Sequence, residues 1–383
     1  MKLILHDQNK RGSLDEYYRR AFKQATELFI VTAYLTAWDN ELQLNEACRG
    51  FRLIIGKDFG ITRKAACESV MQWLPAKRKS QFLVADLIAG FHPKAVFWSE
   101  GDNKYYAIVG SSNLTRAAFE TNYEANVYSK ISKTEYAAAK EWVKHLECKS
   151  IVVSSDWLSK YHESTRAPGS RRASAKDTSE KDIALIALKL PKPRGTEKQV
   201  EYRRRKLQTH EKKQAGLTRL FVRCANREIE SREFYEQLPN YWSYKIGNRL
   251  QGHGFEISGA WSDFTALSQS FIRIIRTDED DRDDVVAEEI DRLQELSVAT
   301  RAAFLSEMLC LRFRKLYPVL NAPVRKFLTD KKFKPPSKAS EGARYIDLAK
   351  KLRFSLLQNP EHAAKDLAEL DAVIWLAYGK KKK

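Results

Sequence analysis

Cysteine is scarce and scattered in this sequence of 383 residues. The five cysteines are an odd number, and no two of them form a Cys-x-x-Cys pair. Such usage excludes a disulfide framework and offers no ligand spacing for a zinc site. We therefore expect free thiols in a reducing cytoplasm.

Long apolar runs are absent as well. No segment of the sequence approaches the ~20 apolar residues that a helix needs to span a bilayer. The opening residues include Lys2, His6 and Asp7, a pattern that predicts a β-strand rather than a signal peptide. We expect a cytoplasmic protein with no membrane partner.

Positive charge is in clear excess, with 67 basic against 49 acidic side chains and a formal net charge of +18. A charge of this size favours a polyanionic partner, nucleic acid or an acidic membrane surface, over a merely soluble basic protein. Hydrophobic residues make up 43% of the chain, enough to bury real cores. The length favours two domains.

Strand-like and helix-like patterns alternate over residues 1–165. The β-prone apolar runs lie at 28–34, 51–55, 82–85, 94–98, 105–109 and 125–128. A helix is expected between Thr62, as its N-cap, and Pro75, and another over 133–146. This alternation predicts an α/β domain with a layered sheet flanked by helices.

A basic segment follows over 166–215. Residues 166–213 hold 15 Lys or Arg and 6 Asp or Glu, a net +9 that is half of the whole excess. We interpret the segment as a basic linker along phosphates, and the alternative is a solvated linker that touches nothing. The residues expected to contact nucleic acid are Arg203, Arg204, Arg205 and Lys206.

Helical patterns dominate from 216 to 383, which predicts a mainly α-helical C-terminal domain for recognising DNA or a partner protein. An acidic run at 278–284 could bind Mg²⁺, but such a run more often solvates a helix N-terminus. Trp242, Tyr244 and Trp261 could stack on bases or could pack in the core.

Three short segments of the first domain carry recognisable chemistry. They are His92-Pro93-Lys94, then Gly110-Ser111-Ser112-Asn113, then Glu124. Alternate residues of a strand share a face, so a histidine and a lysine two apart point the same way. Adjacent strands would add hydroxyl, amide and carboxylate groups, which are the groups that phosphoryl transfer uses. A second His-x-Lys triplet begins at His210, but it has no companion motif.

This arrangement resembles the phospholipase D superfamily, whose signature is His-x-Lys followed by Gly-Ser/Gly-x-Asn. It is most similar to the nuclease branch, which contains metal-independent endonucleases and restriction endonucleases with a phospholipase D-like domain. The resemblance covers roughly residues 1–165. One position departs from the fuller signature, because Ser99 stands where the signature has an aspartate.

The resemblance implies a mechanism and a set of residue roles. His92 would attack phosphorus to give a phosphohistidine, and the same residue of a second subunit would protonate the leaving oxygen. Lys94 and Asn113 would hold the nonbridging oxygens, and Ser111 could add a hydroxyl donor. Glu124 would orient an imidazole. No metal or other cofactor is implied.

The function expected from the resemblance is metal-independent DNA cleavage in a homodimer, in a restriction or phage-defence setting and with a possible partner ATPase or helicase. The first alternative is a noncatalytic nucleic-acid-binding component of a larger complex. The second is a phospholipase, against which stand the single motif, the lost aspartate and the lack of a clear membrane-binding amphipathic helix.

Overall fold

The computed structural model describes residues 1–7, 13–164, 187–250, 255 and 259–379. The chain forms two compact units. The N-terminal unit comprises Met1–Ile186 with Pro335–Ala339, and the C-terminal unit comprises Ala187–Lys334 with Ser340–Lys383. The main division between the units, at Ile186–Ala187, falls inside the segment predicted as a basic linker.

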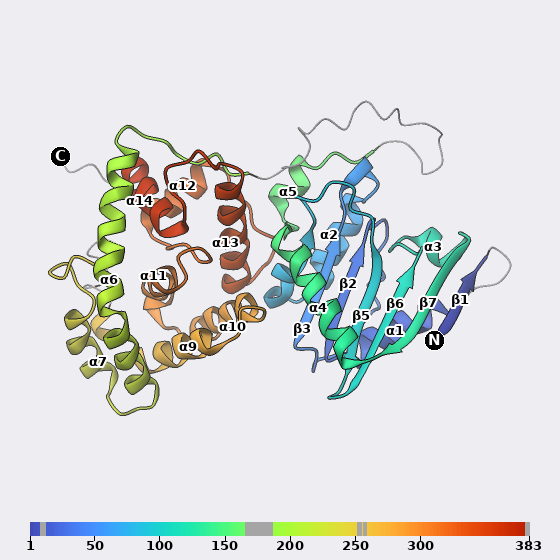
Figure 1. The fold of residues 1–383 in the computed structure, drawn as a ribbon, viewed down its shortest axis with the longest axis horizontal. Coiled ribbons are helices and arrows are strands. Elements are labelled where there is room, and N and C mark those ends of the chain that lie inside the picture. The colour runs from blue at the N-terminus through green and yellow to red at the C-terminus, as the bar shows by residue number, and fades with distance from the viewer. Residues whose placement is uncertain (8–12, 165–186, 251–254, 256–258, 380–383) are drawn as a thin grey trace. The chain divides into compact units, whose positions relative to one another are not determined.

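The described part of the N-terminal unit is built on one eight-stranded mixed sheet in the order β1-β7-β6-β5-β2-β3-β4-β8 (Figure 1). Its strands are β1 (Lys2–His6), β2 (Glu27–Thr32), β3 (Gly50–Ile55), β4 (Phe82–Val84), β5 (Lys94–Glu100), β6 (Lys104–Gly110), β7 (Glu124–Ile131) and β8 (Ile151–Val152). β3 pairs in parallel with β2 and β4, and the other pairings are antiparallel.

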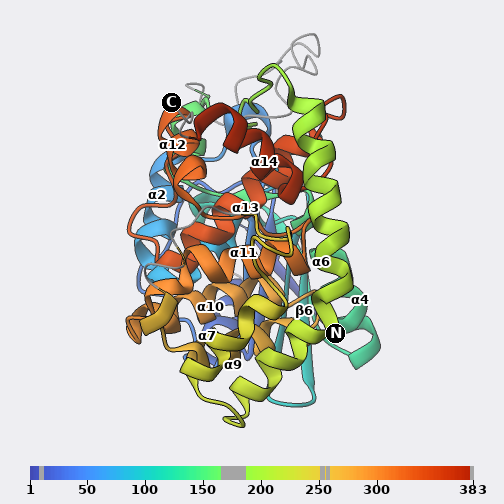
Figure 2. The same ribbon diagram turned by 90° about the vertical axis from the view of Figure 1, so that its left-hand side faces the viewer.

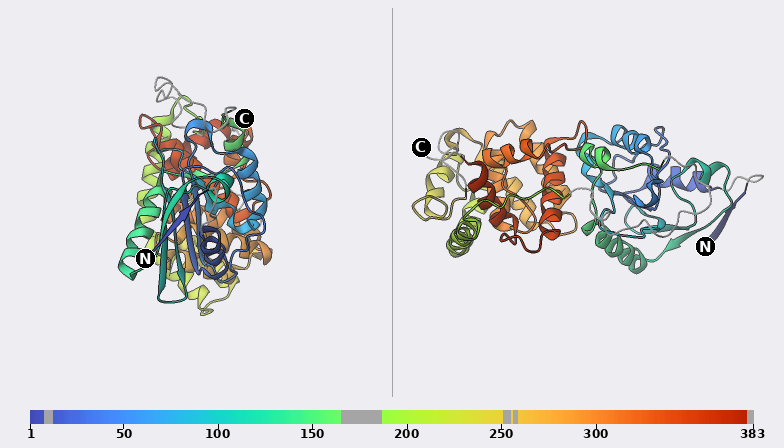
Figure 3. Two further views of the ribbon diagram at one scale, coloured as in Figure 1. Left: turned by 90° about the vertical axis from the view of Figure 1, so that its right-hand side faces the viewer. Right: turned by 90° about the horizontal axis from the view of Figure 1, so that it is seen from above.

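Helices cover both faces of this sheet (Figure 3). The helices of the unit are α1 (Leu14–Gln24), α2 (Lys64–Trp73), α3 (Arg116–Glu120), α4 (Lys133–Cys148) and α5 (Ser155–Lys160). On one face, Arg20 of α1 lies 4.7 Å from the ring centre of Tyr106. On the other face, Tyr136 of α4 stacks on Tyr105. The predicted layered α/β domain is confirmed.

One helix start was predicted wrongly. Helix α2 begins at Lys64, and its N-cap position is Arg63 rather than Thr62. The Thr62 hydroxyl instead donates to the Gly56 carbonyl at 2.7 Å and accepts from the Leu35 backbone N–H at 3.3 Å. The residue is fully buried, so its hydroxyl satisfies two backbone groups between loops instead of capping the helix.

The C-terminal unit is mainly helical, as predicted. Its helices are α6 (Thr196–Ala225), α7 (Ser231–Gln237), α9 (Phe264–Arg276), α10 (Arg282–Glu295), α11 (Ala303–Arg312), α12 (Ala322–Asp330), α13 (Glu341–Leu357) and α14 (Leu367–Tyr378). The long helix α6 runs along the unit and packs against α9 and α14 (Figure 2). Within the described ranges, no helix is both long and apolar enough to cross a membrane.

The predicted basic linker over 166–215 differs from the structure in its second half. Its first part, up to residue 186, lies outside the described residues. From Thr196 onward the chain is helix α6, whose apolar side chains Val200, Leu207 and Leu217 are buried. These positions recur at helical spacing, but the many charged residues between them led to the prediction of a linker instead of a helix.

Candidate active site

Five strands of the N-terminal sheet end or begin at the same edge. The register pairs Thr32, the last residue of β2, with Lys94, the first residue of β5. It also pairs Gly110 at the end of β6 with Asn126 of β7. Directly paired residues share a sheet face, and so do residues two apart along a strand. The polar ends of the strands therefore gather on one face, as the motif spacing predicted.

His92 and Lys94 are in direct contact. The Lys94 ammonium Nζ lies 3.0 Å from His92 Nδ1 and 3.3 Å from Nε2, and it donates to the His92 carbonyl at 3.1 Å. His92 is exposed and precedes β5, while Lys94 is partly buried at the first strand position. The ring of Tyr34 meets the imidazole edge-on, with 5.7 Å between ring centres. The imidazole thus contacts an ammonium and an aromatic ring, while the residue as a whole stays exposed to solvent.

Hydrogen bonds to its side-chain carbonyl oxygen hold Asn113 near His92 and Lys94. Its Oδ1 accepts from the Tyr34 backbone N–H at 3.1 Å and lies 3.3 Å from the Thr32 hydroxyl. Because Thr32 is the register partner of Lys94, these bonds hold Asn113 next to the lysine. Both use Oδ1, and no described residue accepts from the Nδ2 amide, which leaves that donor for a ligand oxygen.

Ser111 and Glu124 form the third part of the site. The Ser111 hydroxyl donates to Glu124 Oε2 and accepts from the Ala125 backbone N–H at 2.9 Å. The other carboxylate oxygen accepts from Asn122 Nδ2 at 3.1 Å. These contacts join Glu124 to a hydroxyl and an amide, and its role in orienting an imidazole stays a prediction. The carboxylate is buried and oriented from two sides.

The close packing around Gly110 explains why the second motif begins with glycine. A Cβ atom there would lie 2.5 Å from the Ala125 carbonyl oxygen and closer still to Asn126 Oδ1. Contacts that short force the backbone to shift. Any other residue at this position would require β6 and β7 to shift relative to each other next to Ser111 and Glu124.

Lys94 experiences two opposing effects. Burial lowers the pKa of its ammonium, and the negative charge of Glu124 raises it. The net pKa lies below the usual value for lysine. The carboxylate therefore acts electrostatically on the lysine across β6, in addition to its hydrogen bonds.

His6 belongs to the same polar face, and no local pattern in the sequence pointed to it. It ends β1, it is 4% exposed, and its register partner is Glu124. The two residues lie too far apart along the chain for any short motif to link them. Only the pairing of β1 with β7 places His6 opposite Glu124 on the same face of the sheet.

Ser99, at the position of the missing signature aspartate, lies at the far end of β5. Its hydroxyl lies 2.9 Å from the Thr26 hydroxyl, and its carbonyl accepts from the Thr26 backbone N–H at 2.8 Å. The residue is buried and ties β5 to the start of β2. Its contacts are structural and lie away from the edge that holds His92.

Most of the basic cluster Arg203–Lys206 of α6 forms ion pairs or hydrogen bonds within the C-terminal unit. Arg203 is buried and pairs with Asp371 at 2.8 Å, and Arg204 pairs with Glu369 at 2.7 Å. Lys206 donates to the Arg249 carbonyl at 2.8 Å. Helical spacing turns Arg203 inward, which corrects the prediction that all four residues lie along phosphates. Arg205, with 70% of its side chain exposed, remains directed to solvent.

The second His-x-Lys triplet is not a site. His210 lies inside α6 and is 3% exposed, and burial lowers the pKa of its imidazole to about 4. The acidic run at 278–284 likewise serves a helix start. Asp283, in the first turn of α10, pairs with Arg353 at 3.0 Å.

Comparison with known proteins agrees with the motifs. Residues 18–147 match the protein family described as "Cardiolipin synthase, PLD-like domain". Over this segment the chain is similar to phospholipase D-like domains, which confirms the predicted resemblance there. No curated protein sequence matches the chain. Among solved structures the chain is similar to NucT from Helicobacter pylori, at 14% sequence identity and a TM-score of 0.29, over 40% of this chain and 98% of that one.

Proposed function

We propose that the chain is a metal-independent phosphodiesterase that cleaves DNA through a phosphohistidine at His92. The observation that carries the proposal is the contact between Lys94 and His92 at a sheet edge where Asn113 and Glu124 also converge. An exposed imidazole beside a fixed cation and a free amide donor suits attack on a phosphodiester. The net charge of +18 favours a nucleic-acid substrate.

In the proposed reaction a ring nitrogen of His92 attacks phosphorus, so that a P–N bond forms and the P–O bond to the leaving strand breaks. The leaving oxygen takes a proton from His92 of a second copy of the chain. That imidazole then takes a proton from water, whose oxygen bonds to phosphorus while the P–N bond breaks and the first His92 is released. Lys94 and the Asn113 amide hold the nonbridging oxygens during both steps.

The need for a second histidine implies a homodimer in which the His92 ends of the two sheets meet. The exposed Leu3, Leu5 and Val109 cannot form this contact, because the register places them on the face of the sheet opposite Lys94.

The deciding experiment measures cleavage of single- and double-stranded DNA in excess EDTA by the wild type and by His92→Ala. His145→Ala is the matched control, because His145 is exposed on α4 away from the motif. We expect metal-free cleavage by the wild type and the control and none by His92→Ala. Cleavage that requires added Mg²⁺, or that survives His92→Ala, would refute the histidine mechanism.

A noncatalytic nucleic-acid-binding role is the alternative that the net charge of +18 supports. It predicts DNA binding that weakens with salt, together with no turnover by any variant. A phospholipase would instead cleave phosphatidyl substrates. A restriction or phage-defence role and a partner ATPase or helicase are part of the proposal through the resemblance of the motifs to the nuclease branch.

A further inference from the structure

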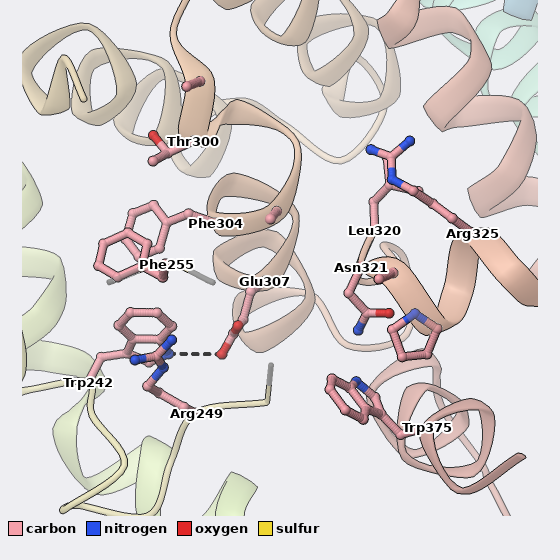
Figure 4. Close-up of a pocket in the computed structure, with 14 residues that line it drawn as sticks. Trp242, Arg249, Phe255, Thr300, Phe304, Glu307, Leu320, Asn321, Arg325 and Trp375 are labelled. Carbon is pink, nitrogen blue, oxygen red and sulfur yellow. Dashed lines mark hydrogen bonds between the residues drawn. The ribbon is translucent and has the colours of Figure 1, made fainter. Parts of the chain in front are cut away.

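The C-terminal unit contains a cavity of about 350 Å³ that has no part in the site described above (Figure 4). Its volume lies within the range of small-molecule pockets in proteins. Aromatic rings of Trp242, Phe255 and Phe304 form one wall, and Trp375 lines the opposite side (Figure 4). Flat rings facing a cavity of this size suit a flat, aromatic ligand.

A buried carboxylate lies between these walls. Glu307 is 0% exposed, and its Oε1 accepts from Trp242 Nε1 at 2.9 Å and from the Leu250 backbone N–H at 2.7 Å. Its Oε2 is buried and has no hydrogen-bond partner among the residues that the structure describes. Burial raises the pKa of Glu307, opposed by the two donors and by Arg249. An unsatisfied buried oxygen is costly, which favours a ligand N–H as its partner.

A second buried group without a hydrogen-bond partner lines the cavity, and it is a donor rather than an acceptor. The indole N–H of Trp375 is buried, and the described part of the chain offers it no acceptor. Among the described residues that line the cavity, Glu307 Oε2 is thus an acceptor and Trp375 Nε1 a donor that lack a hydrogen-bond partner. Arg249 holds the first wall in place, because its guanidinium lies 4.3 Å from the ring centres of both Trp242 and Tyr244.

A cation stands among the lining residues. Arg325 of α12 is exposed, and within the described ranges its guanidinium pairs with no carboxylate. Figure 4 places it beyond Asn321, on the side of Trp375. A free guanidinium at this position can bind a phosphate attached to a ligand that lies between the rings.

We propose that this cavity binds a nucleobase with an exocyclic amino group, with Arg325 on the attached phosphate. The amino N–H donates to Glu307 Oε2, a ring acceptor takes the Trp375 N–H, and the base stacks on the aromatic wall. Adenine, guanine and cytosine carry both an amino donor and an adjacent acceptor, whereas uracil lacks the amino group. The base could belong to a free nucleotide or to an unpaired position of a strand, and both present the same chemistry.

The test uses the full chain with His92→Ala, so that no strand is cut during titration. Tryptophan fluorescence and calorimetry would follow binding of AMP, GMP, CMP and UMP, and of a short single-stranded oligonucleotide. We expect saturable binding of the amino-bearing nucleotides and at least ~10-fold weaker binding of UMP, because an unmatched Glu307 is left unpaired. Binding of the oligonucleotide without the mononucleotides would identify the strand as the source of the base.

Variants tie the binding to the cavity. Glu307→Gln removes the charge, Trp375→Phe removes the N–H and keeps a ring, and each should weaken binding at least ~10-fold. Arg325→Ala should weaken nucleotide binding, while Lys326→Ala at its exposed neighbour should not. Thermal unfolding checks that each variant folds. Absence of saturable binding to any probe, or binding that folded Glu307→Gln and Trp375→Phe leave unchanged, would overturn the proposal.

Discussion

The ammonium of Lys94 lies within 3.3 Å of both ring nitrogens of His92, so whichever nitrogen carries the lone pair has the cation beside it. A phosphate oxygen that approached the imidazole would meet the same ammonium. This geometry makes Lys94 the residue on which charge stabilisation depends in the proposed reaction.

Lys94→Met is therefore expected to lower the rate of DNA cleavage by about 10²–10³-fold, the usual loss when one stabilising donor is removed. Lys104→Met is the matched control, because Lys104 is exposed at the start of β6. Single-turnover cleavage in EDTA would measure both rates. Equal rates in the two variants would show that Lys94 is not part of the chemistry.

Glu124→Gln should change the pH dependence of cleavage. The Glu124 carboxylate raises the pKa of Lys94, so its neutralisation lets that pKa fall further below the usual lysine value. The alkaline limb of the rate profile, where Lys94 loses its proton, should then move to lower pH. Glu120→Gln on α3 is the control and should leave the limb in place. A limb that stays fixed in Glu124→Gln would contradict the electrostatic coupling.

The need for two copies of His92 leads to a prediction about assembly. The wild type should form a dimer, and the rate of cleavage per chain should fall at protein concentrations where the dimer dissociates, because each site then lacks its second histidine. Sedimentation over a concentration series, compared with cleavage rates at the same concentrations, would measure both. A wild type that stays monomeric while it cleaves DNA would refute the shared site.

The sequence predicted the strands of the N-terminal unit well, because alternating and continuous apolar runs report burial on a sheet directly. It also placed Lys94 and Asn113 near each other, since both flank strands joined by a short hairpin. It could not find His6, whose partner Glu124 is fixed by the pairing of β1 with β7. Long-range pairing leaves no trace in a local pattern.

The same limit explains the error over the basic cluster. A run of cations predicts a solvated surface, yet Arg203 is buried because Asp371, far along the chain, neutralises it on α14. Thr62 shows the reverse case. Its side chain has the chemistry of an N-cap, but two buried backbone groups of neighbouring loops use its hydroxyl instead.

Arg203 offers a test of this structural role. Removing one partner of a buried ion pair leaves an uncompensated charge, so Arg203→Met should lower the free energy of unfolding by about 3–5 kcal/mol. Arg205→Met should change it by less than about 0.5 kcal/mol, because Arg205 forms an exposed pair with Glu201 on the same helix. Urea unfolding at pH 7 measures both. Equal losses of unfolding free energy in the two variants would contradict the buried ion pair of Arg203.

Asp283 should make the stability of the C-terminal unit depend on pH. Burial acts to raise the pKa of its carboxyl, but Arg353, Lys350 and the Tyr317 hydroxyl outweigh it and hold the pKa well below the usual range. A depressed pKa in the folded state stabilises the fold above the unfolded value of about 3.9, and this contribution is lost as pH falls toward the folded value.

Asp283→Asn is accordingly expected to lower the free energy of unfolding by about 1–3 kcal/mol at pH 7, because it removes the charged acceptor of a partly buried ion pair. The difference from the wild type should shrink as the pH falls from about 4 toward 2, because the unfolded carboxyl then takes up its proton and the wild type loses this contribution. Asp278→Asn, at an exposed residue of the same acidic run, should have little effect at either pH. Urea unfolding at pH 7 and pH 3 decides the matter, because a deficit of constant size would mean that the substitution at Asp283 disturbs packing rather than charge.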